Sequence, residues 1–233
     1  MNFLDYKPSF DTLMGVKPEP NEREKALFAR AEKYIRKISW IPGLRMVAVV
    51  NSLSMYTTHE GSDIDLFVIT AKNRIWFVRV LMTLVFWLYG VWRYGEDIKG
   101  NFCLSFFIEE DAMDMSRIAL EDDIYLFFWM YYMKPILVVG DMWERFKMVN
   151  GEWWMVNENK IIVLQQKSRV FDGSFLNVLN TTIRFLGEWK ARRSYEKKWR
   201  PEWVIITRNM LKFHDQDRRR EISERISRKN IDK

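Results

Sequence analysis

The feature that most constrains the fold is the run Gly61–Ile69, in which two acidic residues flank one apolar residue and an apolar stretch follows. Alternation of this kind predicts a β-strand, whose successive side chains point to opposite faces of a sheet. Asp63 and Asp65 are therefore expected to lie side by side on one face. Neighbouring carboxylates repel each other, so a sheet rarely carries such a pair without a counter-charge. Oxygen ligands are what Mg²⁺ requires, and the run therefore predicts a divalent-metal site.

A second strand is predicted upstream, because Leu44–Val50 is a mostly apolar run rich in β-branched residues. It leads into Asn51 and Ser52, and a short polar stretch then brings Ser62 and the acid pair. This order of strand, small-residue turn and Asp-x-Asp strand resembles the core of the DNA polymerase β-like nucleotidyltransferase superfamily. In that family a strand ends in Gly-Ser, and the next strand begins with Ser-Asp-x-Asp. The resemblance covers roughly Leu44–Glu110, which is less than half of the chain.

The resemblance implies a function and a set of site residues. The expected enzyme is a metal-dependent nucleotidyltransferase, which moves a nucleoside monophosphate from a nucleoside triphosphate to a hydroxyl acceptor. Asp63 and Asp65 would then be catalytic and would hold Mg²⁺. Asn51, Ser52 and Ser62 would bind the nucleotide at its phosphates. The acceptor stays open, because nucleic acids, protein side chains and small molecules all serve as acceptors among similar proteins.

The turn between the two predicted strands departs from the family pattern, because Asn51 stands where the family has glycine. Glycine tolerates positive φ and lets a phosphate approach the backbone closely. Asparagine is among the least penalised other residues in the left-handed region, so the turn can survive the change. Its side chain would nevertheless crowd a triphosphate.

The second departure is the lack of a third carboxylate in mid-strand, because family enzymes carry one on a later strand. The matching run is Asn101–Ile108, and its alternation places Asn101, Cys103, Ser105 and Phe107 on one face. That face has no carboxylate in mid-strand. Glu109 continues the same face at the strand's end and is the candidate third metal ligand, although a solvated acidic turn is the simpler interpretation.

These departures leave two classes of function open. One is the enzyme described above. The other is a catalytically inactive nucleotide-binding or protein-interaction module on the same fold. The enzyme is favoured, because paired carboxylates lower stability when no cation visits them.

The order of predicted elements indicates an α+β fold with a small mixed sheet and helices packed on it. Asn21 is expected to cap a first helix. After this helix come the two strands, then an apolar helix from about residue 73 to 92, and then the strand with Cys103. The predicted organisation is a nucleotidyltransferase-like core over 18–115 and a mostly helical region over 116–233.

The apolar helix also raises the possibility of a membrane span, because Ile75–Trp92 carries Arg79 as its single charge. A spanning helix would bury Arg79 in lipid and would separate strands that should share one sheet. A buried core helix is therefore predicted, and the membrane is not expected as a partner. The single cysteine, Cys103, excludes an internal disulfide, and the N-terminus lacks a signal-peptide pattern. We expect a cytoplasmic protein.

The formal charge of +6 is unevenly distributed, with a basic run at Arg184–Arg200. Aromatic residues such as Trp189 are interleaved with these charges, which makes nucleic acid a candidate partner through stacking and phosphate contacts. A solvated helical face with internal ion pairs is the simpler and favoured interpretation.

Overall fold

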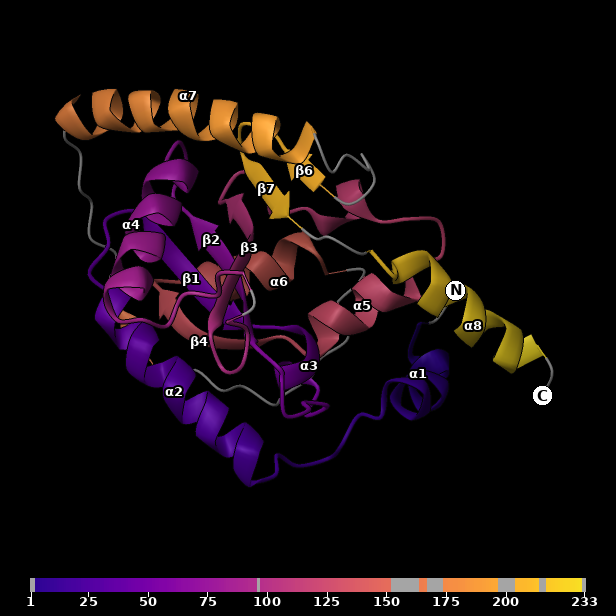
Figure 1. Cartoon of the computed structure of the whole chain (residues 1–233). Helices are drawn as coiled ribbons and strands as arrows, with labels where there is room; N and C mark the ends of the chain where they lie inside the picture. Colours follow the sequence, from indigo (N-terminus) through magenta and orange to yellow (C-terminus); the bar gives the residue numbers. More distant parts are fainter. Residues whose placement is uncertain are drawn as a thin grey trace.

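The structure is a computed structural model that describes residues 3–95, 97–151, 164–166, 174–196, 204–213 and 217–231 (Figure 1). These residues form a seven-stranded mixed sheet in the order β5-β4-β1-β2-β3-β7-β6. The strands are β1 Leu44–Val49, β2 Ile64–Thr70, β3 Phe102–Glu109, β4 Lys134–Val139, β5 Leu164–Gln166, β6 Val204–Ile206 and β7 Met210–Phe213.

Helices cover both faces of the sheet. They are α1 Lys7–Met14, α2 Glu22–Ile38, α3 Asn51–Ser54, α4 Ile75–Leu88, α5 Ile124–Tyr131, α6 Met142–Val149, α7 Ser174–Glu196 and α8 Arg219–Ile231, with short 3-10 helices η1 Phe3–Tyr6 and η2 Met115–Ile118. Helices α2, α4 and α7 pack on one apolar core, and α5 and α6 pack on the core of the opposite face. The predicted α+β class is confirmed.

The central strand β2 has the predicted alternation. Ile64, Leu66 and Val68 are buried in the core under α2 and α4. Phe67 and Ile69 are buried in the core under α5 and α6, on the face that Asp63 and Asp65 share. Each such side chain contributes about 1.5–3 kcal/mol when fully buried. A register slip by one residue would reverse every face, so the position of the acid pair is strongly specified.

The second half of the chain joins the same sheet. Strand β4 pairs antiparallel with β1, and β7 pairs antiparallel with β3. The region 116–233, predicted to be mostly helical, therefore also supplies the outer strands β4 to β7, and the expected boundary after residue 115 runs through one sheet. Pro135 in β4 lies beside an irregularity in the β1–β4 pairing, as expected for a residue without an N–H to donate.

Helix α4 is a core helix, and at Ile75–Leu88 it is shorter than the helix predicted from about residue 73 to 92. It ends because Gly90 adopts a left-handed conformation with φ 62°. The N–H groups of Gly90 and Val91 then donate to the carbonyls of Trp87 and Phe86, which is a Schellman motif. Among the described residues, no helix is both long enough and apolar enough to cross a membrane.

A β-bulge in β3 separates Glu109 from the acid pair. Asp65 lies opposite Cys103, but Phe67 lies opposite Phe106, so β3 contains one extra residue between these pairs. Phe106 is therefore on the face of the acid pair, and Phe107, which was predicted there, is in the opposite core. The alternation that placed Glu109 on the face of the acid pair fails at this point.

Glu109 instead caps α4. Its Oε1 accepts hydrogen bonds from the N–H groups of Arg74 at 3.1 Å and Ile75 at 3.3 Å, and the residue is 2% exposed. These are donors that a helix N-terminus cannot satisfy internally. The structure does not bring the expected third metal ligand to the pair.

Glu109→Ala is expected to lower the free energy of unfolding by about 2 kcal/mol. The N–H of Ile75 at the buried helix end loses its acceptor, and the N–H of Arg74 keeps only the carbonyl of Ala71. Urea denaturation measures the change. The control is Glu60→Ala, whose side chain is 79% exposed, and which should stay within about 0.5 kcal/mol of the parent. A Glu109 variant as stable as the parent would contradict the capping role.

Candidate active site

Asp63, Asp65 and Cys103 converge where β2 and β3 begin. One ligand atom from each of the three side chains lies within 4.8 Å of the other two. Asp63 immediately precedes β2, Asp65 is its second residue, and Cys103 lies opposite Asp65 on the parallel strand β3. In the part of the chain that the structure describes, this is the one group of acid, cysteine or histidine side chains that meets the spacing of a metal site. The shared face predicted for the two aspartates is present.

Arg93 supplies a counter-charge that the sequence did not indicate. Its Nη1 donates to Asp63 Oδ2 at 2.6 Å and also lies 3.7 Å from the sulfur of Cys103. Arg93 follows α4, thirty residues after Asp63, and pairing of its N–H with Phe102 holds this segment beside β3. The repulsion within the acid pair is therefore relieved in part by a guanidinium, which a metal ion would have to displace or share.

The pKa of Asp65 is strongly raised. Burial, and then the charge of Asp63, raise its pKa to about 6. Hydrogen bonds from Asn51 and Cys103 act in the opposite direction. Burial and the charge of Asp65 also hold the pKa of Cys103 well above its usual range. The thiol therefore keeps its proton and donates a hydrogen bond to Asp65. A neutral thiol is a poor ligand for a hard cation, which leaves the two carboxylates as the donor set.

The Asn51 turn adopts the left-handed conformation that glycine supplies in the family pattern, with φ 56°. Its side chain has a role that glycine cannot fill. The Oδ1 atom accepts a hydrogen bond from Trp129 Nε1 at 2.8 Å, which orients the amide, and the amide group bonds Asp65. Asn51 therefore links the acid pair to α5.

The two serines expected at the phosphates occupy different environments. Ser52 is half-buried in the first turn of α3, where backbone N–H groups have no partner within the helix. Ser62 is buried, and its hydroxyl accepts a hydrogen bond from the N–H of His59 at 2.9 Å. Ser62 thus organises the loop before β2, and Ser52 is the better placed of the two to face a ligand.

A cavity of about 210 Å³ opens beside Asn51, on the face of the sheet that carries the acid pair. Small-molecule sites usually enclose roughly 300–1,000 Å³, so this cavity suits part of a ligand. The charge of Asp65 contributes, after burial, to the raised pKa of Tyr125 in the cavity wall, which places that wall within electrostatic reach of the pair. The aromatic and cationic side chains in the wall are Phe106, Tyr125, Trp129, Lys212, Arg218 and Arg219.

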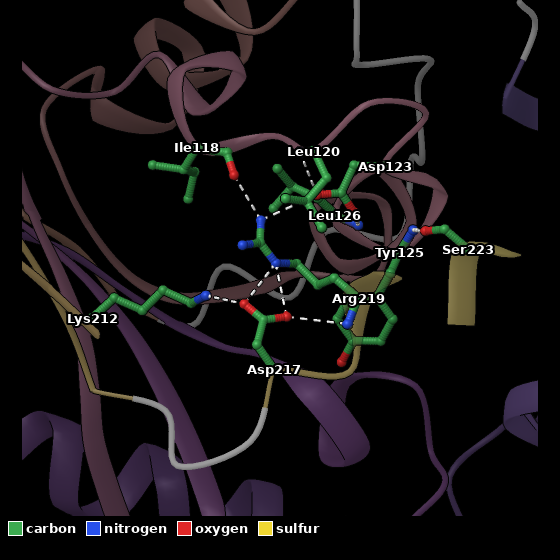
Figure 2. A network of polar contacts seen from close by, with 9 residues as sticks. All are labelled: Ile118, Leu120, Asp123, Tyr125, Leu126, Lys212, Asp217, Arg219 and Ser223. Carbon is green, nitrogen blue, oxygen red and sulfur yellow. Dashed lines mark hydrogen bonds and ion pairs between the residues drawn. The ribbon is translucent and has the colours of Figure 1, made fainter. Parts of the chain in front are cut away.

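A buried ion network fixes this wall (Figure 2). Asp217 bonds Lys212 Nζ at 2.6 Å and Arg219 Nε at 2.9 Å. Arg219 Nη1 reaches Asp123 at 3.1 Å and the carbonyl of Ile118 at 2.7 Å. Two cations face two anions, so the network is charge-balanced, and losing one member would leave a buried charge unpaired. It joins β7 and the start of α8 to the N-terminus of α5.

The cavity wall was missed by the sequence analysis, because most of its residues come from segments more than fifty positions away from the acid pair. The acids Glu121–Asp123 before an apolar run indicate a helix start, and Asp123 does cap α5 by accepting a hydrogen bond from Leu126 N–H at 2.9 Å. Nothing in the local sequence pairs Asp123 with Arg219.

Comparison with known proteins identifies no relative. No protein-family model matches the chain, and neither does any curated protein or any solved structure. The function is therefore inferred from the geometry of the acid pair and from the strand-turn-strand sequence that contains it.

In protein freed of divalent cations with EDTA, Asp65→Asn is expected to raise the free energy of unfolding near pH 7.5 by about 2 kcal/mol. The native pKa of about 6 lies above the value of about 4 for an unfolded aspartate. The folded protein therefore binds the extra proton between these values, and stability falls as pH rises through this window. The gain should shrink toward zero near pH 4.

Urea unfolding at both pH values measures this difference. The matched control is Asp63→Asn, which relieves the same repulsion but removes the partner of Arg93, so it should stabilise the protein less than Asp65→Asn does. Equal stability of Asp65→Asn and the parent near pH 7.5 would show that the native fold does not disfavour the ionised Asp65 carboxylate.

Proposed function

We propose that the chain is a metal-dependent nucleotidyltransferase that moves a nucleoside monophosphate from a nucleoside triphosphate to a hydroxyl acceptor. The observation that carries the proposal is the convergence of Asp63 and Asp65 on one face of β2, beside the left-handed Asn51 turn that ends β1. Two carboxylates at this spacing suit a divalent cation with oxygen ligands. The resemblance of the sequence around both features supports the same assignment.

The donor set fits Mg²⁺, with Asp63 and Asp65 as the protein's ligands. Bound there, the ion supplies charge neutralisation at the phosphates and lowers the pKa of an attacking hydroxyl. Arg93 pairs with Asp63; with an ion held by that carboxylate, its guanidinium would be free to bind an anionic substrate. Asn51 keeps Asp65 oriented through the hydrogen bond from Trp129.

The remaining features of the face accommodate the nucleotide. In this proposal, backbone N–H groups in the first turn of α3 and the hydroxyl of Ser52 bind phosphate oxygens. The aromatic side chains of Phe106, Tyr125 and Trp129 give the neighbouring cavity walls that suit a planar ring. The cavity holds a ring system while the phosphates extend toward the acid pair.

A second candidate function is a nucleotide-binding module without turnover. Two observations favour it: the strand beside the pair offers Cys103 in place of a third carboxylate, and Arg93 already neutralises Asp63. Calorimetry with ATP, with and without Mg²⁺, separates the two functions. The module predicts a complex without pyrophosphate release, and the enzyme predicts release once an acceptor is present.

Arg93→Gln is expected to tighten Mn²⁺ binding at the acid pair about tenfold, because a competing positive charge beside Asp63 is removed. Calorimetric titration of Mn²⁺ measures the affinity without any need for turnover. Asp63→Asn is the opposing variant and should weaken binding. Unchanged affinity in both variants would place the cation elsewhere.

Asp65→Asn is expected to lower turnover by about 100-fold or more, because the charge that holds the cation at the reacting phosphate is lost. The assay is pyrophosphate release from each of the four ribonucleoside triphosphates with Mg²⁺ and candidate acceptors. Asp111→Asn, an acid variant in the turn that follows β3, serves as the control and should keep the parent's rate. Full turnover in the Asp65 variant would reject the assignment.

A further inference from the structure

The outer sides of α4 and α7 carry more than half of the large apolar side chains that are exposed in the described residues. On α7, Phe185 is 72% exposed, and Leu186 and Trp189 are each 57% exposed. On α4 the exposed side chains are Val80, Leu84, Trp87 and Leu88. A monomer rarely leaves such a set uncovered without an interaction to make.

Helical spacing explains why the exposed side chains of α7 lie together. Phe185, Leu186 and Trp189 fall on one side of the helix. The opposite side packs inward, where Gly187 lies so close to Trp76 that an added Cβ would come within 2.4 Å of its ring. Ile183 likewise packs on the core. The apolar outer side is therefore not used to hold α7 on the protein.

The two helices lie side by side on one face of the sheet. Both pack on the same core, and Figure 1 shows α7 running above one end of α4. The exposed apolar side chains of each helix lie on the side turned away from that core. Because the two helices are in contact, their outer sides adjoin each other.

Positive charge borders this apolar surface. Lys190, Arg192 and Arg193 are exposed on α7, and the guanidinium of Arg193 lies 5.4 Å from the ring of Trp189. The half-buried Glu188 is the one carboxylate among the α7 side chains that the structure describes, against three exposed cations, and the α4 sequence contains no carboxylate. These cations belong to the basic run Arg184–Arg200, of which residues 197–200 lie outside the described residues.

We propose that the outer sides of α4 and α7 form a docking surface for an anionic lipid bilayer. Tryptophan, phenylalanine and leucine side chains insert at the boundary between headgroups and acyl chains, and lysine and arginine pair with anionic headgroups. The attachment is peripheral, so it keeps the strands on either side of α4 in one sheet. This proposal differs from the expectation, drawn from the sequence, that the membrane is not a partner. That expectation rested on the cost of burying Arg79 in a membrane-spanning helix.

The composition of the surface favours lipid over the other macromolecules that it might meet. Nucleic acid would use the cations and the aromatic rings, but it gives no role to Val80, Leu84 and Leu88. A protein interface is usually depleted of lysine, whereas Lys190 lies beside the apolar side chains. The proposal is independent of nucleotide transfer, because the docking surface covers the face of the sheet opposite the acid pair.

The test is flotation of the full chain with vesicles of phosphatidylcholine alone and of phosphatidylcholine with phosphatidylglycerol. The parent should float with the anionic vesicles, and added salt should weaken the binding. Phe185→Ser with Trp189→Ser should reduce the partition coefficient about tenfold or more, because two exposed apolar anchors are lost. Lys190→Gln with Arg193→Gln should remove most of the preference for anionic vesicles.

Two further variants keep the proposal falsifiable. Met148→Ser removes a 76% exposed side chain on α6, which packs on the opposite face of the sheet, and should leave flotation unchanged. Trp87→Ser with Leu88→Ser tests α4 independently if the α7 variant proves unfolded by circular dichroism.

Two results would overturn the proposal. The first is a parent protein that does not float with anionic vesicles, and the second is flotation of the α7 and α4 variants that equals that of the parent. If the parent does not float, binding to single-stranded RNA and self-association in sedimentation velocity are measured for the parent and the same variants. Loss of RNA binding in the variants would assign the surface to nucleic acid, and loss of self-association would assign it to a second copy of the chain.

Discussion

The site depends on the repulsion between two carboxylates that a buried strand holds side by side. Strand β2 lies in the middle of the sheet, and the apolar side chains on both of its faces fix its register, so Asp63 and Asp65 cannot move apart by a slip. The protein meets the repulsion in two ways: Arg93 pairs with Asp63, and Asp65 accepts hydrogen bonds while its pKa rises. Both are partial solutions that a cation would complete.

Much of the fold followed from local pattern. The period of two in β2 placed the acid pair correctly, and the left-handed turn expected at Asn51 is present. Asn21 caps α2 as predicted, because it accepts a hydrogen bond from Glu24 N–H at 3.0 Å and Glu24 returns one. Each of these features is decided within a few residues, which is the range over which sequence patterns act.

The failures share a different physical cause. The bulge in β3 arises from pairing with β2 and reverses the alternation on which the expectation for Glu109 rested. Arg93 and the cavity wall reach the acid pair through tertiary contacts, as does the buried network that joins Asp123 to Arg219. Strands β4 and β7 join the sheet through long-range pairing. A periodicity carries no information about which distant segments meet.

The most direct test of the account is a crystal soaked with Mn²⁺ and a nucleoside triphosphate, with data collected at the manganese absorption edge. The account predicts an anomalous peak between Asp63 and Asp65, with an oxygen of each at about 2.1 Å and Arg93 turned toward the phosphates. A map without a peak at this position, in which Arg93 still pairs with Asp63, would contradict the claim that the acid pair exists to bind a metal ion.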